Sequence, residues 1–348
     1  MSATPPVTIT IDLTTNLRAP DAVLPVGGTL GFMPSGNLLV LKRLTSGRAE
    51  VYEFTPGEGS WTEVGKAEIK SSSGSRAGGA ISPDGTRCVY GPKTAKVYGW
   101  PGGKAMASLG AVKYSLGANT VGFSPSGAWV VVADNGRISP RQRTVTVFDA
   151  GTGEKRAAIK TDEWCFVQAG MLDDDTVVTL GLHLDWDVAK GWTDDDLVLG
   201  CYDVTTGAAR WRRKIHDGQR FALEPVARQV WIADDGAPHG TGAELCLAAD
   251  DGRVLRSIAF SSGWRAGRLP PVVVRPGLVA VGVVPVDGKP QDARFVLLDL
   301  EAGRQVATLG EGRGTDYNFD CFATAHTASQ WLASVDFFGN ETYLWRLA

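Results

Sequence analysis

Three of the four histidines are concentrated in one part of the chain, and they are the residues best suited to metal chemistry. His183, His216 and His239 lie near several carboxylates in the sequence, namely Asp185, Asp187, Asp234 and Asp235. Imidazole and carboxylate groups together can bind a divalent transition metal. None of the three histidines lies at a typical metal-ligand spacing from another ligand within the same strand or loop. We therefore expect no cofactor. The alternative is a metal-dependent enzyme or small-ligand sensor with a metal site at His183, His216 and His239.

Other signatures of catalysis are absent from the sequence. We find no nucleophile elbow, Walker loop or dinucleotide-binding glycine pattern, and the 43 glycines are spread over turns. The Gly151-Thr152-Gly153 segment precedes a predicted strand and not a helix, which is typical of a hairpin. The sequence therefore favours a non-catalytic protein.

The elements that must position any site are repeated along the chain. A tight turn between two apolar segments recurs seven times, roughly every fifty residues. It is strongest at residues 33–36, 82–85 and 124–127, which read Met-Pro-Ser-Gly, Ser-Pro-Asp-Gly and Ser-Pro-Ser-Gly. Weaker versions occur at residues 173–175, 225–228, 275–277 and 326–329. This turn is the first of two independent sequence features that recur with the same period, and such a shared period indicates a repeat architecture.

The second mark is a strand that ends in Asp, followed four residues later by Gly. Three repeats contain it, at Asp149 with Gly153, Asp203 with Gly207 and Asp299 with Gly303. The fifth repeat keeps Gly252 but has Ala248 in place of the Asp. Gly at this position supplies the positive φ angle that such turns require.

Each repeat is predicted to form four short strands, designated a to d in chain order. In the third repeat they span residues 118–123, 129–133, 144–149 and 155–160. The predicted fold is all-β, a single seven-bladed β-propeller of four-stranded antiparallel blades covering residues 1–348.

The last repeat supplies only three strands, at residues 318–323, 331–337 and 342–347. Residues 7–13 alternate apolar and polar side chains like a d strand. We therefore expect residues 7–13 to pair beside residues 342–347, so that blade seven consists of residues 7–13 and 314–348. Such pairing would remove two exposed sheet edges.

On these motifs the whole chain resembles WD-repeat and related seven-bladed propellers with an Asp-x-x-x-Gly hairpin between strands c and d. It has no Gly-His pair in the d–a loops, and no Trp-Asp dipeptide closes strand c. The resemblance implies a scaffold that binds another protein or domain.

The loops between strands b and c are long in repeats three to six, and long loops tend to carry function. With the d–a loops they form the predicted binding face. Aromatic residues and Arg dominate protein interfaces. The candidate partner-binding residues are Arg137, Arg141, Trp164, Trp186, Trp192, Trp264, Arg265, Arg268 and Tyr317. Trp264, in a loop over residues 261–270, is expected to be a solvent-facing contact, and the alternative is that it folds back over the long loop of repeat five or six. A carbohydrate-binding or small-ligand site on this face is a further alternative.

Composition narrows the partner class. The net charge of −3 argues against nucleic acid, which selects a basic surface. No apolar run approaches the roughly 18 residues of a membrane span. The first residues lack the basic region of a signal peptide. We expect a cytoplasmic protein that is monomeric by itself, with neither nucleic acid nor membrane as a partner. Its five cysteines are expected to be buried free thiols.

Overall fold

The repeated turns separate short antiparallel strands. The computed structural model describes residues 7–44, 48–57, 60–69, 78–91, 94–111, 120–133, 143–161, 163–183, 197–215, 221–234, 243–266, 271–287, 294–309, 323–326, 328–335 and 341–347. The chain forms two compact units. One contains residues 28–214, and the other contains residues 1–27 and 215–348.

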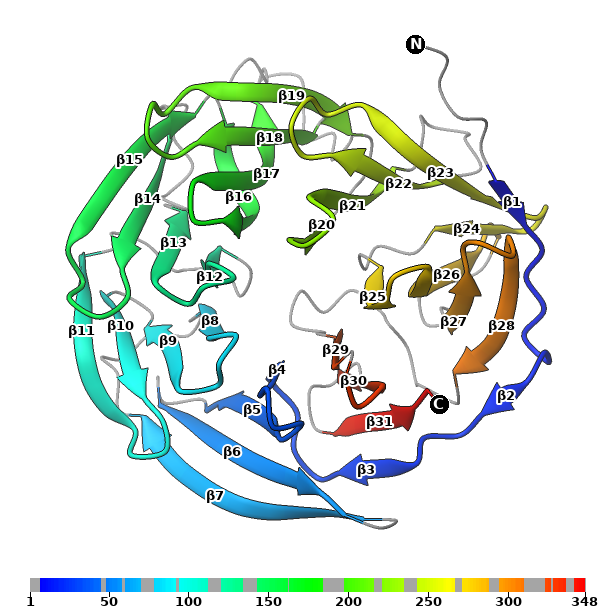
Figure 1. Ribbon diagram of the computed structural model, residues 1–348, viewed down its shortest axis with the longest axis horizontal. Coiled ribbons are helices and arrows are strands. Elements are labelled where there is room, and N and C mark those ends of the chain that lie inside the picture. The colour runs from blue at the N-terminus through cyan, green and yellow to red at the C-terminus, as the bar shows by residue number, and fades with distance from the viewer. Residues whose placement is uncertain are drawn as a thin grey trace. The chain divides into compact units, whose positions relative to one another are not determined.

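The described part of the unit of residues 28–214 contains four antiparallel sheets of four strands each (Figure 1). The first two sheets are β4 (Thr29–Phe32), β5 (Leu38–Arg43), β6 (Ala49–Pro56) and β7 (Trp61–Ile69), then β8 (Gly78–Ile81), β9 (Arg87–Gly91), β10 (Thr94–Gly99) and β11 (Lys104–Ala111). The next two are β12 (Val121–Phe123), β13 (Trp129–Ala133), β14 (Arg143–Asp149) and β15 (Lys155–Thr161), then β16 (Glu163–Asp173), β17 (Thr176–His183), β18 (Leu197–Asp203) and β19 (Ala209–Ile215).

The unit of residues 1–27 and 215–348 contains three sheets in its described part. The first has β20 (Phe221–Glu224), β21 (Gln229–Asp234), β22 (Ala243–Ala248) and β23 (Val254–Phe260). The second has β24 (Trp264–Ala266), β25 (Val272–Arg275), β26 (Leu278–Pro285), β27 (Arg294–Asp299) and β28 (Arg304–Leu309). The third has β29 (Ala323–His326), β30 (Trp331–Val335) and β31 (Thr342–Arg346).

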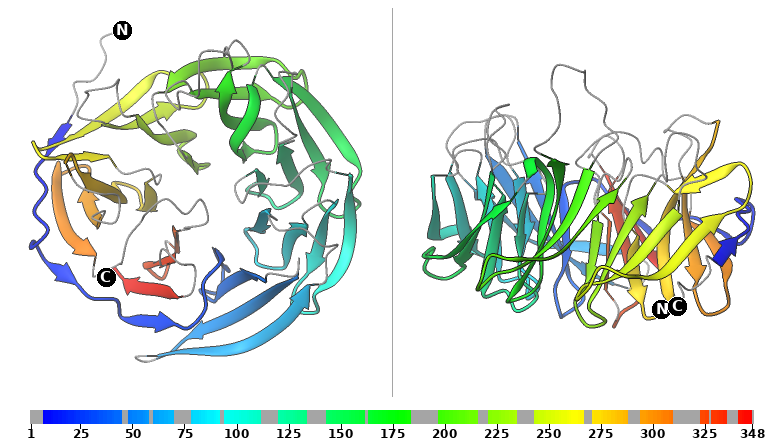
Figure 2. Two further views of the ribbon diagram at one scale, coloured as in Figure 1. Left: turned by 180° about the vertical axis from the view of Figure 1, so that it is seen from behind. Right: turned by 90° about the horizontal axis from the view of Figure 1, so that it is seen from above.

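The N-terminal segment adds one strand to each of these three sheets. β1 (Val7–Ile9) pairs with β23, β2 (Leu17–Arg18) with β28 and β3 (Ala22–Leu24) with β31. Both face-on views show this segment following the edges of the three sheets (Figures 1 and 2). We refer to residues 7–24 as the N-terminal strap.

The predicted pairing of residues 7–13 with the last blade is wrong. An N-terminal strand does complete the last sheet, but it is β3, in which Ala22 lies opposite Leu344 and Leu24 opposite Thr342. Residues 7–9 instead run parallel to β23. Ile9 and Ile11 are only 1% and 8% exposed, and they pack in the apolar cluster between the β23 and β26 sheets. The alternation of apolar and polar residues in this segment indicates that one face of the strand is buried. It does not specify which sheet covers that face.

Elsewhere the predicted strands lie close to the observed ones. β13 has the predicted limits, and β14 and β15 each extend one residue further than expected. In the last repeat, residues 318–322 of the predicted first strand lie outside the described residues, and β29 continues to His326, beyond the predicted end at residue 323.

Adjacent sheets within each unit pack face to face through rows of aliphatic side chains. In the unit of residues 28–214, Val89 and Val97 of one sheet share a buried cluster with Val121 and Val130 of the next. Strands covered on both faces need nearly continuous apolar residues, as in Val130-Val131-Val132. The sheets and their four-stranded antiparallel order are those of a seven-bladed β-propeller.

Candidate functional site

Most of the residues predicted to bind a partner or a metal lie outside the described residues. These are Arg137, Arg141, Trp186, Trp192, His216, His239, Arg268 and Tyr317. Trp164 lies in β16, and His183 ends β17, where its backbone pairs with that of Glu163. In the part of the chain that the structure describes, no three His, Cys, Asp or Glu side chains are grouped to bind a metal ion. The metal site and the loop surface therefore stay predictions.

Trp264 and Arg265 are described, and their local structure differs from the prediction. They lie in β24, where Trp264 is opposite Pro285 and Arg265 is opposite Val284. The Trp264 side chain is half-buried against the same apolar cluster that contains Ile9. The expectation of a solvent-facing indole in a loop is wrong, because strand pairing with β26 holds the residue against the sheet. Contact of either residue with a partner stays a prediction.

The repeated Asp residues organise hairpins. Asp149 Oδ1 accepts hydrogen bonds from the backbone N–H groups of Gly151 and Thr152, at 2.8 and 2.7 Å. Asp299 Oδ1 accepts the corresponding bonds from Glu301 and Ala302. These backbone bonds hold the pKa of both carboxyl groups below their ordinary value. The a–b and c–d hairpins lie at the same end of each sheet, which we call the turn end.

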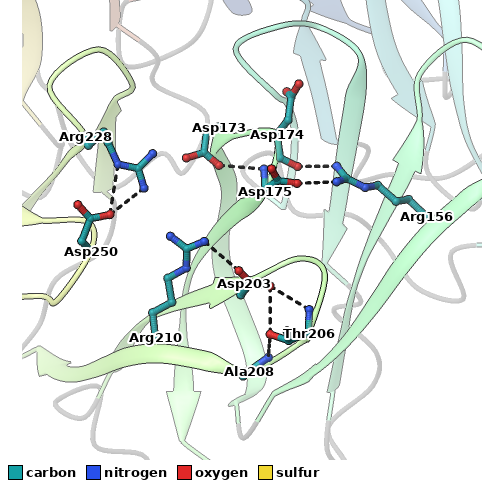
Figure 3. Close-up of polar contacts among 10 residues, drawn as sticks. All are labelled: Arg156, Asp173, Asp174, Asp175, Asp203, Thr206, Ala208, Arg210, Arg228 and Asp250. Carbon is teal, nitrogen blue, oxygen red and sulfur yellow. Dashed lines mark hydrogen bonds and ion pairs between the residues drawn. The ribbon is translucent and has the colours of Figure 1, made fainter.

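Several arginines at the turn end are paired with carboxylates of the fold (Figure 3). Arg156 donates to the backbone carbonyl oxygen of Asp174 and to Asp175 Oδ1, both at 2.6 Å. Its guanidinium carbon also lies 4.2 Å from the ring centroid of Trp129. Arg210 forms an ion pair with Asp203 at 2.9 Å, and Arg228 with Asp250 at 2.8 Å. The Asp173-Asp174-Asp175 turn thus has a structural role, as the sequence predicts.

A different arrangement occurs in the unit of residues 1–27 and 215–348. A groove of about 900 Å³ lies where the N-terminal strap, the β28 sheet and the β31 sheet meet. This volume is within the range of about 300–1,000 Å³ that is usual for ligand pockets. The described residues that line it are Asn16, Leu17, Arg18, Arg275, Leu278, Leu297, Asp299, Arg304, Val306, Ala307, Gln330 and Leu347. We call it the strap groove.

The floor of the strap groove is aliphatic and firmly packed. Leu278, Leu297, Ala307 and Leu347 are buried in the cluster that joins the β28 and β31 sheets. Leu17, at the rim, is 60% exposed. An apolar floor with an exposed apolar rim can accept an aliphatic side chain, and the burial of that side chain would stabilise the complex.

Hydrogen bonds fix the wall of the groove that the strap supplies. Asn16 Nδ2 donates to the carbonyl oxygen of Val306 at 2.9 Å, and the Arg18 guanidinium donates to the carbonyl oxygen of Arg346 at 2.6 Å. Asn16 adopts a φ of 43°, a left-handed conformation that Asn tolerates better than most residues. The wall is therefore ordered before any ligand arrives.

Among the described residues, three arginines and one carboxylate line the strap groove. Arg275 and Arg304 are exposed, and both contribute to lowering the pKa of Asp299, after the larger effect of its backbone hydrogen bonds. Within the described residues neither guanidinium has a carboxylate within ion-pair distance, in contrast to Arg156 and Arg210. Their donors remain available for an anionic group. Sequence analysis missed this site, because Arg18 is distant in sequence from Arg275 and Arg304 and no motif connects them.

Comparisons with known proteins identify the fold. No family model matches the sequence, and no curated protein matches it significantly. The solved structures that it resembles include the C-terminal WD40 domain of Sif2, with 12% identity over 96% of this chain and 99% of that chain and a TM-score of 0.60. A chain of the mitotic checkpoint complex gives 10% identity over 99% and 97%, with a TM-score of 0.63.

A chain of the Kuenenia stuttgartiensis hydrazine synthase gives 15% identity over 93% of this chain and 96% of that chain, with a TM-score of 0.59. The chain therefore has the fold of the WD-repeat-like seven-bladed β-propellers, as its sequence motifs predict. Identities of 10–15% establish the fold alone. No helix among the described residues is long and apolar enough to cross a membrane.

Proposed function

We propose that this protein is a non-catalytic protein-binding module, and that the strap groove is one of its binding surfaces. The observation that carries the proposal is the composition of the groove, an aliphatic floor bordered by arginines. Buried apolar contacts with Arg at the margin are typical of protein interfaces. Structurally similar chains in the mitotic checkpoint complex and in the WD40 domain of Sif2 support an interaction role.

The loop surface predicted from sequence is a second proposed surface. It comprises the b–c and d–a loops of blades three to six, with Trp186, Trp192, Arg137 and Arg141 as its candidate contacts. The two surfaces make different predictions for cross-linking, so one experiment separates them.

The experiment introduces a photoactivatable phenylalanine analogue at one position at a time. Leu17 reports on the strap groove, Trp192 reports on the predicted loop surface, and exposed Val64 in β7 serves as the control. Each variant is irradiated in extract of the source organism, cross-linked proteins are identified by mass spectrometry, and the pair is reconstituted from purified components. We expect one partner to cross-link from Leu17 and to bind with 1:1 stoichiometry.

Cross-linking from Trp192 and not from Leu17 would assign binding to the loop surface. Equal cross-linking from Val64 and Leu17, or no binding by the purified pair, would contradict the proposal that the groove binds a protein.

A further inference from the structure

We propose that the strap groove is selective for an extended acidic peptide segment, in which a carboxylate pairs with Arg275 and Arg304 and an aliphatic side chain two residues away rests on the leucine floor. This inference rests on the proposed function and specifies the chemistry of the partner.

The first argument is charge. Among the described residues of the lining, Arg18, Arg275 and Arg304 accompany one carboxylate, Asp299. That carboxylate already accepts two backbone hydrogen bonds through Oδ1. A guanidinium has five N–H donors in a planar fork that matches a carboxylate. The groove is thus locally cationic in a chain with a net charge of −3, and an acidic ligand complements it.

The second argument is the shape and chemistry of the floor. Leu278, Leu297, Ala307 and Leu347 offer an aliphatic surface, and none of the described residues that line the groove is aromatic. Single-stranded nucleic acids and nucleotides are usually bound by stacking of bases on aromatic side chains. An aliphatic floor beside two guanidinium groups fits instead an extended peptide with an acidic and an aliphatic residue two positions apart, since an extended chain places the side chains of residues i and i+2 on the same side.

The third argument is preorganisation. The Arg18 guanidinium is held by the carbonyl oxygen of Arg346, and Trp345 Nε1 donates to the carbonyl oxygen of Arg18. Gln330, another residue of the lining, accepts the backbone N–H of Leu347 through its own carbonyl oxygen. A groove with walls that are already ordered loses little conformational entropy when a peptide binds.

The test uses the full-length protein and a pool of capped heptapeptides randomised over Glu, Gln, Lys, Leu, Val and Ser. Peptides captured by the immobilised protein are sequenced by mass spectrometry, and the most enriched peptide is measured by fluorescence anisotropy. We expect enrichment of Glu over Gln and Lys, with Leu or Val two positions away. Higher salt should weaken binding, because partly exposed charge pairs are screened.

Two variants probe the arginines. The double substitution Arg275→Gln and Arg304→Gln should weaken binding of the enriched peptide about tenfold, as expected for the loss of two partly exposed charge pairs. Arg253→Gln is the matched control, since Arg253 is an exposed arginine of the same unit that does not line the groove. It should leave the affinity unchanged. Thermal unfolding of all variants verifies that they are folded.

Capture of no peptide, enrichment of Gln or Lys over Glu, or equal loss of affinity in Arg253→Gln would overturn the inference. Inorganic phosphate and ATP are tested as competitors, and binding of either more tightly than the peptide would also overturn it. If a protein still cross-links from Leu17 while acidic peptides do not bind, the proposed function stands and only its acidic specificity fails.

Discussion

Trp345 Nε1 donates a hydrogen bond to the backbone carbonyl oxygen of Arg18 at 3.1 Å, although 327 positions separate the two residues. The bond is reinforced by the Arg18 guanidinium, which donates to the carbonyl oxygen of Arg346, and by Asp21 Oδ2, which accepts the backbone N–H of Arg346 at 2.7 Å. The strap is therefore bound to the last sheet by side-chain and backbone groups together. Since it also forms one wall of the groove, its attachment and the binding of a partner should be coupled.

The strap should contribute to stability through its buried isoleucine. Ile9→Ala removes aliphatic volume from the cluster between the β23 and β26 sheets, where Ile9 is 1% exposed. We expect the free energy of unfolding to fall by about 2–4 kcal/mol. Thr8→Ala, at the adjacent exposed position, should change it by less than about 0.5 kcal/mol. Urea denaturation followed by tryptophan fluorescence measures both, and equal effects would show that the strap is not packed as described.

A buried amide should fix the centre of the strap. Gln305 accepts the backbone N–H of Asp12 through Oε1 at 3.0 Å and donates through Nε2 to the Asp12 carbonyl oxygen at 2.7 Å. Gln305→Glu replaces the donor with an oxygen that faces this carbonyl and the Thr308 hydroxyl. A buried group left without its partner costs about 1–3 kcal/mol.

Hydrogen exchange locates the effect of that substitution. We expect faster exchange at the amides of Asp12 and Thr308, and slow exchange retained in β26 and β27. Arg304→Gln changes the adjacent exposed residue and should leave these amides protected. Protection of Asp12 in the Gln305→Glu protein would refute the role of this amide.

The recurring turns and the Asp followed four residues later by Gly predict the repeats from sequence. They do so because a hairpin is determined by residues close together in the chain. Asp299 bonds residues two and three positions ahead, and the turn is closed by Gly303 with a φ of 62°. The pairing of the strap, by contrast, depends on which distant sheet it packs against. Residues 7–13 suit any sheet with an apolar flank, and burial of Ile9 against the β23 sheet decides the outcome. The groove depends on the same choice, because the strap brings Arg18 to the groove that Arg304 also lines.

Trp129 and Arg156 should be energetically coupled. The guanidinium carbon lies 4.2 Å from the indole centroid, and the two residues belong to different strands of one sheet. A cation–π pair of this kind contributes about 0.5–1 kcal/mol when partly exposed. A double-mutant cycle with Trp129→Leu and Arg156→Gln should give a coupling free energy of that size. The control cycle replaces Arg156→Gln with Lys155→Gln and should give no coupling free energy. Additive effects of the Trp129 and Arg156 substitutions would contradict the prediction.

Trp264 should contribute to folding stability as well as to any interface. Because its indole is half-buried against the cluster that contains Ile9, Trp264→Ala should lower the free energy of unfolding by about 2 kcal/mol. Val286→Ala, just beyond β26 and 46% exposed, is the control and should have little effect. An unchanged melting temperature with lost partner binding would instead support the interface role predicted from the sequence.

The Asp203 hairpin should give the protein a defined acid sensitivity. The backbone N–H of Thr206, and then Arg210, stabilise the ionised carboxylate and lower the pKa of Asp203 from its ordinary 3.8 to about 2. A group with a pKa lowered by folding contributes stability that is present above its unfolded pKa. This contribution should therefore be complete above about pH 4 and be lost as the pH falls from 3.8 towards 2.

Asp203→Asn removes the titrating group while keeping an oxygen that can accept the Thr206 N–H. The variant should be less stable than the wild-type protein at pH 7, and the difference should shrink as the pH falls through the window between 3.8 and about 2. Arg210→Gln removes one of the causes of the lowered pKa, so its loss of stability on acidification should be shallower than that of the wild-type protein over the same window. Urea denaturation at pH 7, 4, 3 and 2.5, conditions that we choose to bracket the window, measures these slopes. A stability difference between wild type and Asp203→Asn that stays constant from pH 7 to 2.5 would show that the ionised carboxylate does not stabilise this hairpin.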